Sequence, residues 1–194
     1  MERLTINMSL MTLTQINVAL IALSISSFSE IAAQQYISRN VHVSFFSETL
    51  IENIKAENNQ SSSVFDISNG GIAFQVPIRA FHFDRALMEE HFNENYMETE
   101  SYPNATFRGE IENWIDDFAD GITHDIIALG ILTIHGVEKE ISASGTILFK
   151  NNSWIITSDF TVDAEDYDIK IPRIVRDNIA KSIEIKIQAS LSQR

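Results

Sequence analysis

Beyond residue 40, hydrophobic and polar side chains alternate along the chain with a period of two, the period of a β-strand that buries one face. The alternating runs lie at 41–45, 50–57, 63–67, 72–80, 105–111, 141–149, 154–162 and 183–191. Segment 125–134 is apolar in both phases, which is typical of a strand that packs on two sides. Asn69-Gly70-Gly71 and Lys150-Asn151-Asn152 are turn sequences. The pattern predicts about eight or nine antiparallel strands.

Two segments depart from this period and have helical spacing instead. Segment 84–97 has helical three- and four-residue spacings among Leu87, Met88, His91, Phe92 and Asn95, with Asp84 as a suitable N-cap. Segment 171–181 has Pro172 near a first-turn position and carries Ile174, Val175 and Ile179 on one side. Pro77 removes a backbone donor from the run 72–80 and indicates an edge, a bulge or a bend. The pattern as a whole predicts one all-β domain with two short helical insertions.

The N-terminal segment has a different character. Charge is absent between Arg3 and Glu30, and an apolar run extends from Ile16 to Ile25, shorter than the roughly 20 residues of a membrane-spanning helix. Ala32-Ala33 resembles an export-peptidase site, so residues 1–33 are predicted to be a signal peptide and 34–194 the mature domain. The alternative is a buried or anchoring N-terminal helix. We expect a periplasmic or secreted protein without stable membrane insertion of the mature chain.

Composition and charge narrow the function classes. The 194 residues carry 14 Lys and Arg against 27 Asp and Glu, a formal net charge of -13. Such a chain repels phosphate backbones, so we expect no nucleic-acid partner. The sequence has no cysteine, which excludes disulfides, thiolate metal sites and a cysteine nucleophile. A hydrophobic share of 44% is sufficient for a packed interior.

A sheet of about eight strands that closes on itself has an interior that is either filled by side chains or able to hold one small ligand. The sequence has 12 Phe, and large uncharged residues dominate the positions predicted to face inward. These positions are Phe45, Phe74, Phe107, Leu132, Phe149, Trp154 and Phe160. The pattern alone allows both a packed core and an apolar ligand cavity.

Motifs for catalysis or metal binding are weak. The five His residues do not form an HExxH pair, and the acidic clusters at 116–121 and 163–168 lack calcium-loop spacing. No Walker loop, G-x-S-x-G elbow or G-x-G-x-x-G run occurs, so we expect no catalytic residue, metal or cofactor. Basic residues gather at Lys170, Arg173, Arg176 and Lys181, where they serve either an anionic headgroup or ordinary helix solvation.

Two blocks of sequence carry a resemblance to a known family. The first runs from Phe81-His82-Phe83-Asp84 through 87–98 to Tyr102-Pro103-Asn104-Ala105-Thr106-Phe107-Arg108-Gly109. The second is 130–139, Gly-Ile-Leu-Thr-Ile-His-Gly-Val-Glu-Lys. Together they resemble the YceI-like lipid- and polyisoprenoid-binding family, and a fainter likeness extends over 36–191. The departures are a reduced early motif at 40–45 and the polar stretch 57–63.

The resemblance implies a lipocalin-like antiparallel β-barrel, secreted or periplasmic, that holds a long isoprenoid chain. We therefore expect a non-enzymatic protein whose partner is a hydrophobic lipid or isoprenoid, and the sequence leaves a homodimer open. An enzyme with acidic and His residues at the barrel mouth, or an interaction domain with a solid core, are the alternatives. The predicted ligand-binding residues are Phe45, Phe74, Val76, Phe81, Leu87, Met88, Phe92, Phe107, Ala128, Leu132, Phe149, Trp154, Phe160, Arg173, Ile174 and Arg176.

Overall fold

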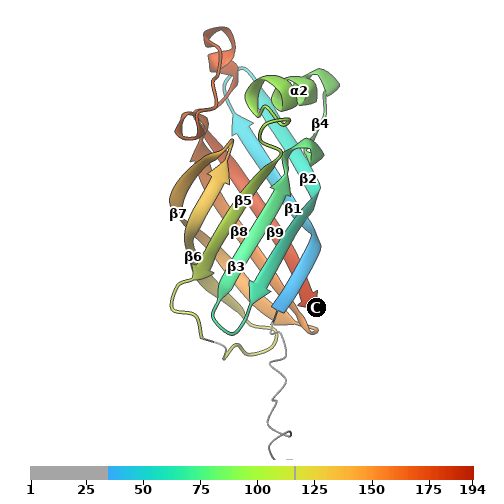
Figure 1. The fold of residues 1–194 in the computed structure, drawn as a ribbon, viewed down its shortest axis with the longest axis vertical. Coiled ribbons are helices and arrows are strands. Elements are labelled where there is room, and N and C mark those ends of the chain that lie inside the picture. Colours follow the sequence, from blue (N-terminus) through green and yellow to red (C-terminus); the bar gives the residue numbers. More distant parts are fainter. Residues whose placement is uncertain (1–34, 116) are drawn as a thin grey trace, which may run out of the picture. The chain divides into compact units, whose positions relative to one another are not determined.

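The computed structural model describes residues 35–115 and 117–194, and the signal peptide expected at 1–33 lies outside these residues. The described strands are β1 (Gln35–Glu48), β2 (Asn53–Asp66), β3 (Gly71–Pro77), β4 (His82–Phe83), β5 (Asn104–Ile111), β6 (Thr123–Ile134), β7 (Val137–Lys150), β8 (Ser153–Asp163) and β9 (Ser182–Gln193). They pair in the order β1-β9-β8-β7-β6-β5-β3-β2-β4, and a further β1–β2 pairing closes the ring. All strands but the two-residue β4 thus form a closed eight-stranded antiparallel barrel (Figure 1). The predicted fold class is confirmed.

The barrel is a meander in which each long strand lies beside the next one along the chain. Tight turns make this possible, because their residues adopt the left-handed backbone conformation that matches the twist of a hairpin. Asn151 and Asn152 have φ of 52° and 59° between β7 and β8, and His135 and Gly136 have φ of 50° and 75° between β6 and β7. The Asn-Asn turn that the sequence indicated is therefore present.

The helical insertions lie where they were predicted, but they are shorter. The first consists of α2 (Ala86–His91), continued by a π-turn, η2 (Phe92–Tyr96). Its N-cap is Arg85 rather than Asp84, and no side chain caps it. The second is a 3-10 helix, η4 (Arg173–Asn178), that follows Pro172. Both insertions lie at the same end of the barrel (Figure 1). Two further 3-10 turns are η1 (Ile78–Ala80) and η3 (Ala164–Tyr167).

Two strand boundaries differ from the prediction. The run 72–80 is not one strand, because β3 ends at Pro77 and residues 78–80 turn away as η1. Conversely, the two runs predicted at 50–57 and 63–67 belong largely to the single strand β2, while residues 50–52 lie in the β1–β2 connection. The middle of β2 is polar and contains a bulge. There the side chain of the buried Asn58 accepts a hydrogen bond from the Gln60 N–H at 2.7 Å and donates one to the Pro77 carbonyl at 2.8 Å. A polar side chain at an inward position interrupts the alternation of hydrophobic and polar residues, so the sequence pattern divided β2 into two separate runs.

Strand β6 was predicted to pack on two sides, and this was wrong. Its inward positions face the barrel interior, whereas Ile127, Leu129 and Ile131 on the outer face are exposed among the described residues. Strand β6 therefore buries side chains on one face only, the face toward the barrel interior.

Candidate functional site

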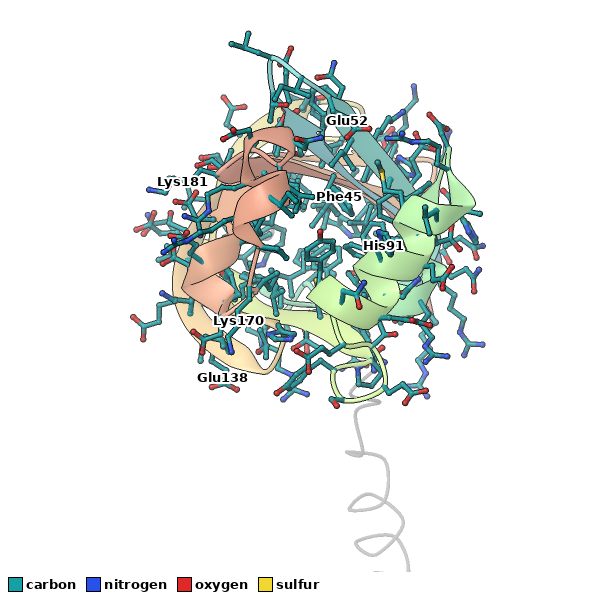
Figure 2. All side chains as sticks on the ribbon, turned by 90° about the horizontal axis from the view of Figure 1, so that it is seen from above. Phe45, Glu52, His91, Glu138, Lys170 and Lys181 are labelled. Atoms are coloured by element: carbon teal, nitrogen blue, oxygen red, sulfur yellow. The ribbon has the colours of Figure 1, made fainter. Side chains whose placement is uncertain are left out.

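The barrel interior contains a cavity of about 430 Å³ that opens at the end carrying α2 and η4. This volume lies in the range of small-molecule sites. All eight barrel strands contribute to its wall, and the contributing side chains are mostly Phe, Ile, Val, Leu and Ala. The view down the barrel in Figure 2 shows α2 and the segment between Lys170 and Lys181 on opposite sides of the opening. The cavity is thus an apolar shaft with one mouth.

Small inward residues leave this space unfilled. Ala128 on β6 pairs with Ala143 on β7, and Gly145 on β7 pairs with Ser158 on β8. All four line the cavity. Larger side chains at these four positions would fill the space, because the interior of an eight-stranded barrel is only just wide enough for ordinary side chains. The width of the cavity is therefore set by four small residues on three adjacent strands.

Below the cavity the barrel is solid. Trp154 lies against Phe65, Trp114, Phe118 and Phe149, with ring centroids 4.9 to 5.8 Å apart. We call these five residues the aromatic floor. The Trp114 indole donates to the Ile67 carbonyl at 2.7 Å and so attaches the β5–β6 loop to the barrel. None of the five lines the cavity, so the aromatic floor closes the shaft at the end opposite α2.

A second aromatic group forms the upper wall beneath α2. The Phe45 ring lies 5.3 Å from Phe81, 5.6 Å from Phe83 and 5.4 Å from Phe92 between centroids. Phe45 belongs to β1, Phe81 comes directly before β4, Phe83 is in β4, and Phe92 is in η2. The contacts fix the helical insertion over the barrel rim and give the mouth an apolar inner surface.

The mouth also has a polar cluster. Glu52, from the β1–β2 connection, forms an ion pair with Arg85, and its Oε2 accepts a hydrogen bond from Asn178 Nδ2 at 3.3 Å. Both partners line the cavity, as does Glu52 itself. Nearby, the buried Ser47 hydroxyl accepts the Ala180 N–H at 2.8 Å. Glu52 therefore joins the α2 side of the mouth to the η4 side.

Tyr167 is the buried titratable residue of the wall. Burial, with a smaller contribution from the Asp166 charge, raises the pKa of its phenol above the ordinary value. Its carbonyl oxygen lies 3.2 Å from His135 Nδ1, which ties η3 to the β6–β7 turn. The neutral phenol adds a hydrogen-bonding group to a mostly apolar wall.

The structure places most of the predicted ligand-binding residues together in the cavity wall. The residues found there are Phe45, Phe74, Val76, Phe81, Leu87, Met88, Phe92, Phe107, Ala128, Leu132 and Phe160. Strand alternation located the members on strands, because one phase of a closed barrel must face inward. Their role in binding a ligand remains a prediction.

Five predicted residues lie elsewhere. Phe149 and Trp154 point inward but belong to the aromatic floor, because their strands run past the bottom of the cavity. Arg173, Ile174 and Arg176 are exposed on η4, where Val175 faces the cavity instead. Of the three residues expected on one side of this segment, Val175 and Ile179 line the cavity, and only Ile174 points away from it. The 3-10 helix repeats every three residues, so Ile174 does not share a side with Val175 as α-helical spacing implied.

Sequence reasoning missed the polar cluster at the mouth. Glu52 and Arg85 lie 33 positions apart and Asn178 far beyond both, and no local spacing connects them. Ile185 and Ile187 of β9 also line the cavity, and the alternating run at 183–191 carried the signal that could have identified them.

Within residues 35–115 and 117–194, no group of three or more His, Asp or Glu side chains is placed to hold a metal ion. No helix in this part of the chain is long and apolar enough to cross a membrane.

Comparisons with known proteins agree with this architecture. A sequence model of the YceI-like domain matches residues 26–191. No curated protein matches the chain. Among solved structures, a polyisoprenoid binding domain from Saccharophagus degradans implicated in plant cell wall breakdown has a TM-score of 0.74 at 12% identity, covering 84% of this chain and 99% of its own.

Two further structures share the fold. Burkholderia cenocepacia BcnA has a TM-score of 0.65 at 15% identity, covering 78% of this chain and 96% of its own. A Campylobacter jejuni YCEI protein has a TM-score of 0.58 at 17% identity, with 74% and 86% covered. The identities are low, so these likenesses show the fold.

Proposed function

The chain belongs to the YceI-like domain family, and from that premise we propose that it binds a lipid or polyisoprenoid chain in the barrel cavity, without covalent chemistry. One observation carries the proposal, namely an apolar cavity of about 430 Å³ that is closed by aromatic rings at one end and open at the other. The polyisoprenoid binding domain from Saccharophagus degradans, which has the same fold, supports this class of ligand.

The energetics favour a long apolar chain over a compact polar ligand. Each methylene group that leaves water for the cavity contributes about 0.8 kcal/mol. The charged side chains Glu52 and Arg85 lie at the mouth, where Glu52 also binds Asn178. A ligand with an apolar chain and one polar end therefore matches the cavity, with the chain inside and the polar end at the mouth.

The depth of the cavity limits how much chain it holds. On β8 the lining positions run from Ile156 to Val162, six residue steps. At about 3.3 Å per residue and a strand tilt of about 40°, the shaft is about 15 Å deep. Carbon–carbon bonds of about 1.5 Å advance an extended chain by about 1.3 Å each, so about twelve bonds fit. We propose that the cavity holds about three isoprene units and that a longer chain leaves its remainder at the mouth.

We also propose that the protein is exported. The apolar run from Ile16 to Ile25 and the pair Ala32-Ala33 support this proposal. The mature chain should begin near Gln34 in a periplasmic or secreted fraction. N-terminal sequencing of the fractionated protein tests this, and an intact Met1 on a membrane-bound product would reject it.

Native mass spectrometry of the mildly purified protein is the first test of binding. A co-purifying lipid supports the proposal, and a ligand that emerges chemically altered would favour the enzyme alternative. Titration with geraniol, farnesol and geranylgeraniol, which have two, three and four isoprene units, tests the depth. Affinity should rise steeply to farnesol and then level off. If no lipid co-purifies and farnesol does not bind, the proposal is wrong.

A further inference from the structure

Four large aliphatic side chains point into solvent at the open end of the barrel. Leu50 and Ile51, in the β1–β2 connection, are 107% and 66% exposed. Leu87 on α2 is 62% exposed, and Ile174 on η4 is 91% exposed. We call these four residues the aliphatic tips. They come from three segments that surround the mouth of the cavity (Figures 1 and 2).

Two of the aliphatic tips, Leu87 and Ile174, adjoin the apolar interior. Leu87 also lines the cavity, and so do Val175 and Ile179 beside Ile174. An apolar path therefore runs from the wall of the shaft to the outermost side chains. Hydrophobic side chains that gather at a rim in this way are typical of a binding surface, whereas single exposed ones are ordinary.

The charges next to Ile174 indicate the chemistry of the partner. Between residues 170 and 181 the chain has Lys170, Arg173, Arg176 and Lys181 against the single acid Asp177. Among the described residues, Lys170, Arg173 and Arg176 form no ion pair, so their charges are available. The chain as a whole has a formal net charge of -13, which makes this basic segment a local exception.

We infer that the open end docks on an anionic lipid bilayer, with the η4 segment foremost. Exposed aliphatic side chains flanked by Lys and Arg insert into the boundary between headgroups and acyl chains, and the cations attract anionic lipid. Docking would place the mouth against the hydrocarbon, so that a lipid chain could pass into the cavity with little exposure to water. The purpose of docking rests on the proposed function, but docking itself can be measured without any ligand.

The test is flotation of the mature protein with vesicles of phosphatidylcholine alone or mixed with phosphatidylglycerol. Binding is expected on the mixed vesicles, with at least a fivefold loss when salt is raised from low to high concentration. Ile174→Ser combined with Leu50→Ser should lower the bound fraction at least fivefold. The matched control is Ile115→Ser, because Ile115 is 65% exposed in the β5–β6 loop at the opposite end.

A second pair of variants tests the charges. Arg173→Glu with Arg176→Glu should abolish the preference for phosphatidylglycerol, whereas Arg39→Glu with Lys150→Glu, exposed residues on β1 and β7, should leave it intact. The inference is overturned if the wild type does not float or if the control variants lose as much binding as the rim variants. It is also overturned if light scattering shows a dimer that the Ile174→Ser and Leu50→Ser changes dissociate, since the tips would then bind a second copy.

Farnesol affinity, measured without vesicles, separates the two proposals. Rim variants that bind farnesol normally but do not float confirm docking as a separate property. Flotation of a protein that does not bind farnesol would leave docking intact and reject the proposed ligand.

Discussion

Filling the cavity should reduce ligand binding without reducing stability, and Ala128→Phe is the sharpest way to do this. Ala128 points into the shaft from β6 and faces another small residue, Ala143, on β7. The phenyl ring would occupy open space in the middle of the cavity. In a solid core, the same enlargement forces neighbouring side chains and backbone to move, at a cost of about 1–3 kcal/mol.

The expected loss of affinity follows from the displaced chain. Ala→Phe adds six carbon atoms, and a ligand that gives up the same volume loses up to about 5 kcal/mol at about 0.8 kcal/mol per carbon. Part of this loss is avoided because the ligand can shift toward the open mouth. We therefore expect a loss of about 2–3 kcal/mol, which is about 30- to 150-fold in the dissociation constant for farnesol.

Ala189→Phe is the matched control. Ala189 is 0% exposed and does not line the cavity, so the same added ring has no space there. Chemical denaturation should show a loss of about 1–3 kcal/mol for Ala189→Phe and a change below about 0.5 kcal/mol for Ala128→Phe. The reasoning is refuted if Ala128→Phe destabilises the protein as much as Ala189→Phe, or if it binds farnesol as tightly as the wild type.

Three further predictions follow from particular contacts. Glu52→Ala breaks both links across the mouth, so stopped-flow measurements should show farnesol dissociating about two- to tenfold faster, and an unchanged rate would show that these links do not hold the mouth. Because the pKa of Tyr167 is raised in the folded state, the contribution of its neutral phenol to stability is complete below pH 10 and is lost as pH rises through the higher pKa of the folded protein. The free energy of unfolding should therefore fall less steeply at alkaline pH in Tyr167→Phe than in the wild type. Gly136→Ala should lower that free energy by about 1–3 kcal/mol in urea denaturation, because φ is 75° there and the new Cβ would lie 2.6 Å from Tyr102 Cε1; a neutral result would contradict this geometry.

The sequence by itself determined the fold class and most of the cavity wall. Period-two alternation identifies inward positions such as Phe74, Phe107 and Leu132 because successive side chains of a strand point to opposite faces. Closing about eight such strands leaves one interior, so inward residues must share it. The family resemblance then linked that interior to a lipid or polyisoprenoid chain.

Local pattern failed where polar groups or backbone irregularities decide the conformation. Asn58 is buried at a bulge, and its polar side chain concealed the continuity of β2. Pro77 indicated an irregularity in the run 72–80, but the pattern did not predict that β3 ends there and continues as η1. On η4, the tighter 3-10 turn exposed Ile174 and turned Val175 to the cavity. Each outcome depends on backbone geometry that a hydrophobic period does not specify.

Only the tertiary structure decided whether the interior is packed or hollow. Phe149 and Trp154 have the same inward phase as residues of the cavity wall, yet they belong to the aromatic floor. The β5–β6 loop brings Trp114 and Phe118 against Trp154, which also contacts Phe149. Higher in the barrel, Ala128 and Ala143 meet across neighbouring strands and leave space. Strand alternation indicates which face of the sheet a side chain occupies. Whether the interior is filled at a given height of the barrel depends on the summed volumes of the side chains that meet there, and these come from strands far apart in the sequence.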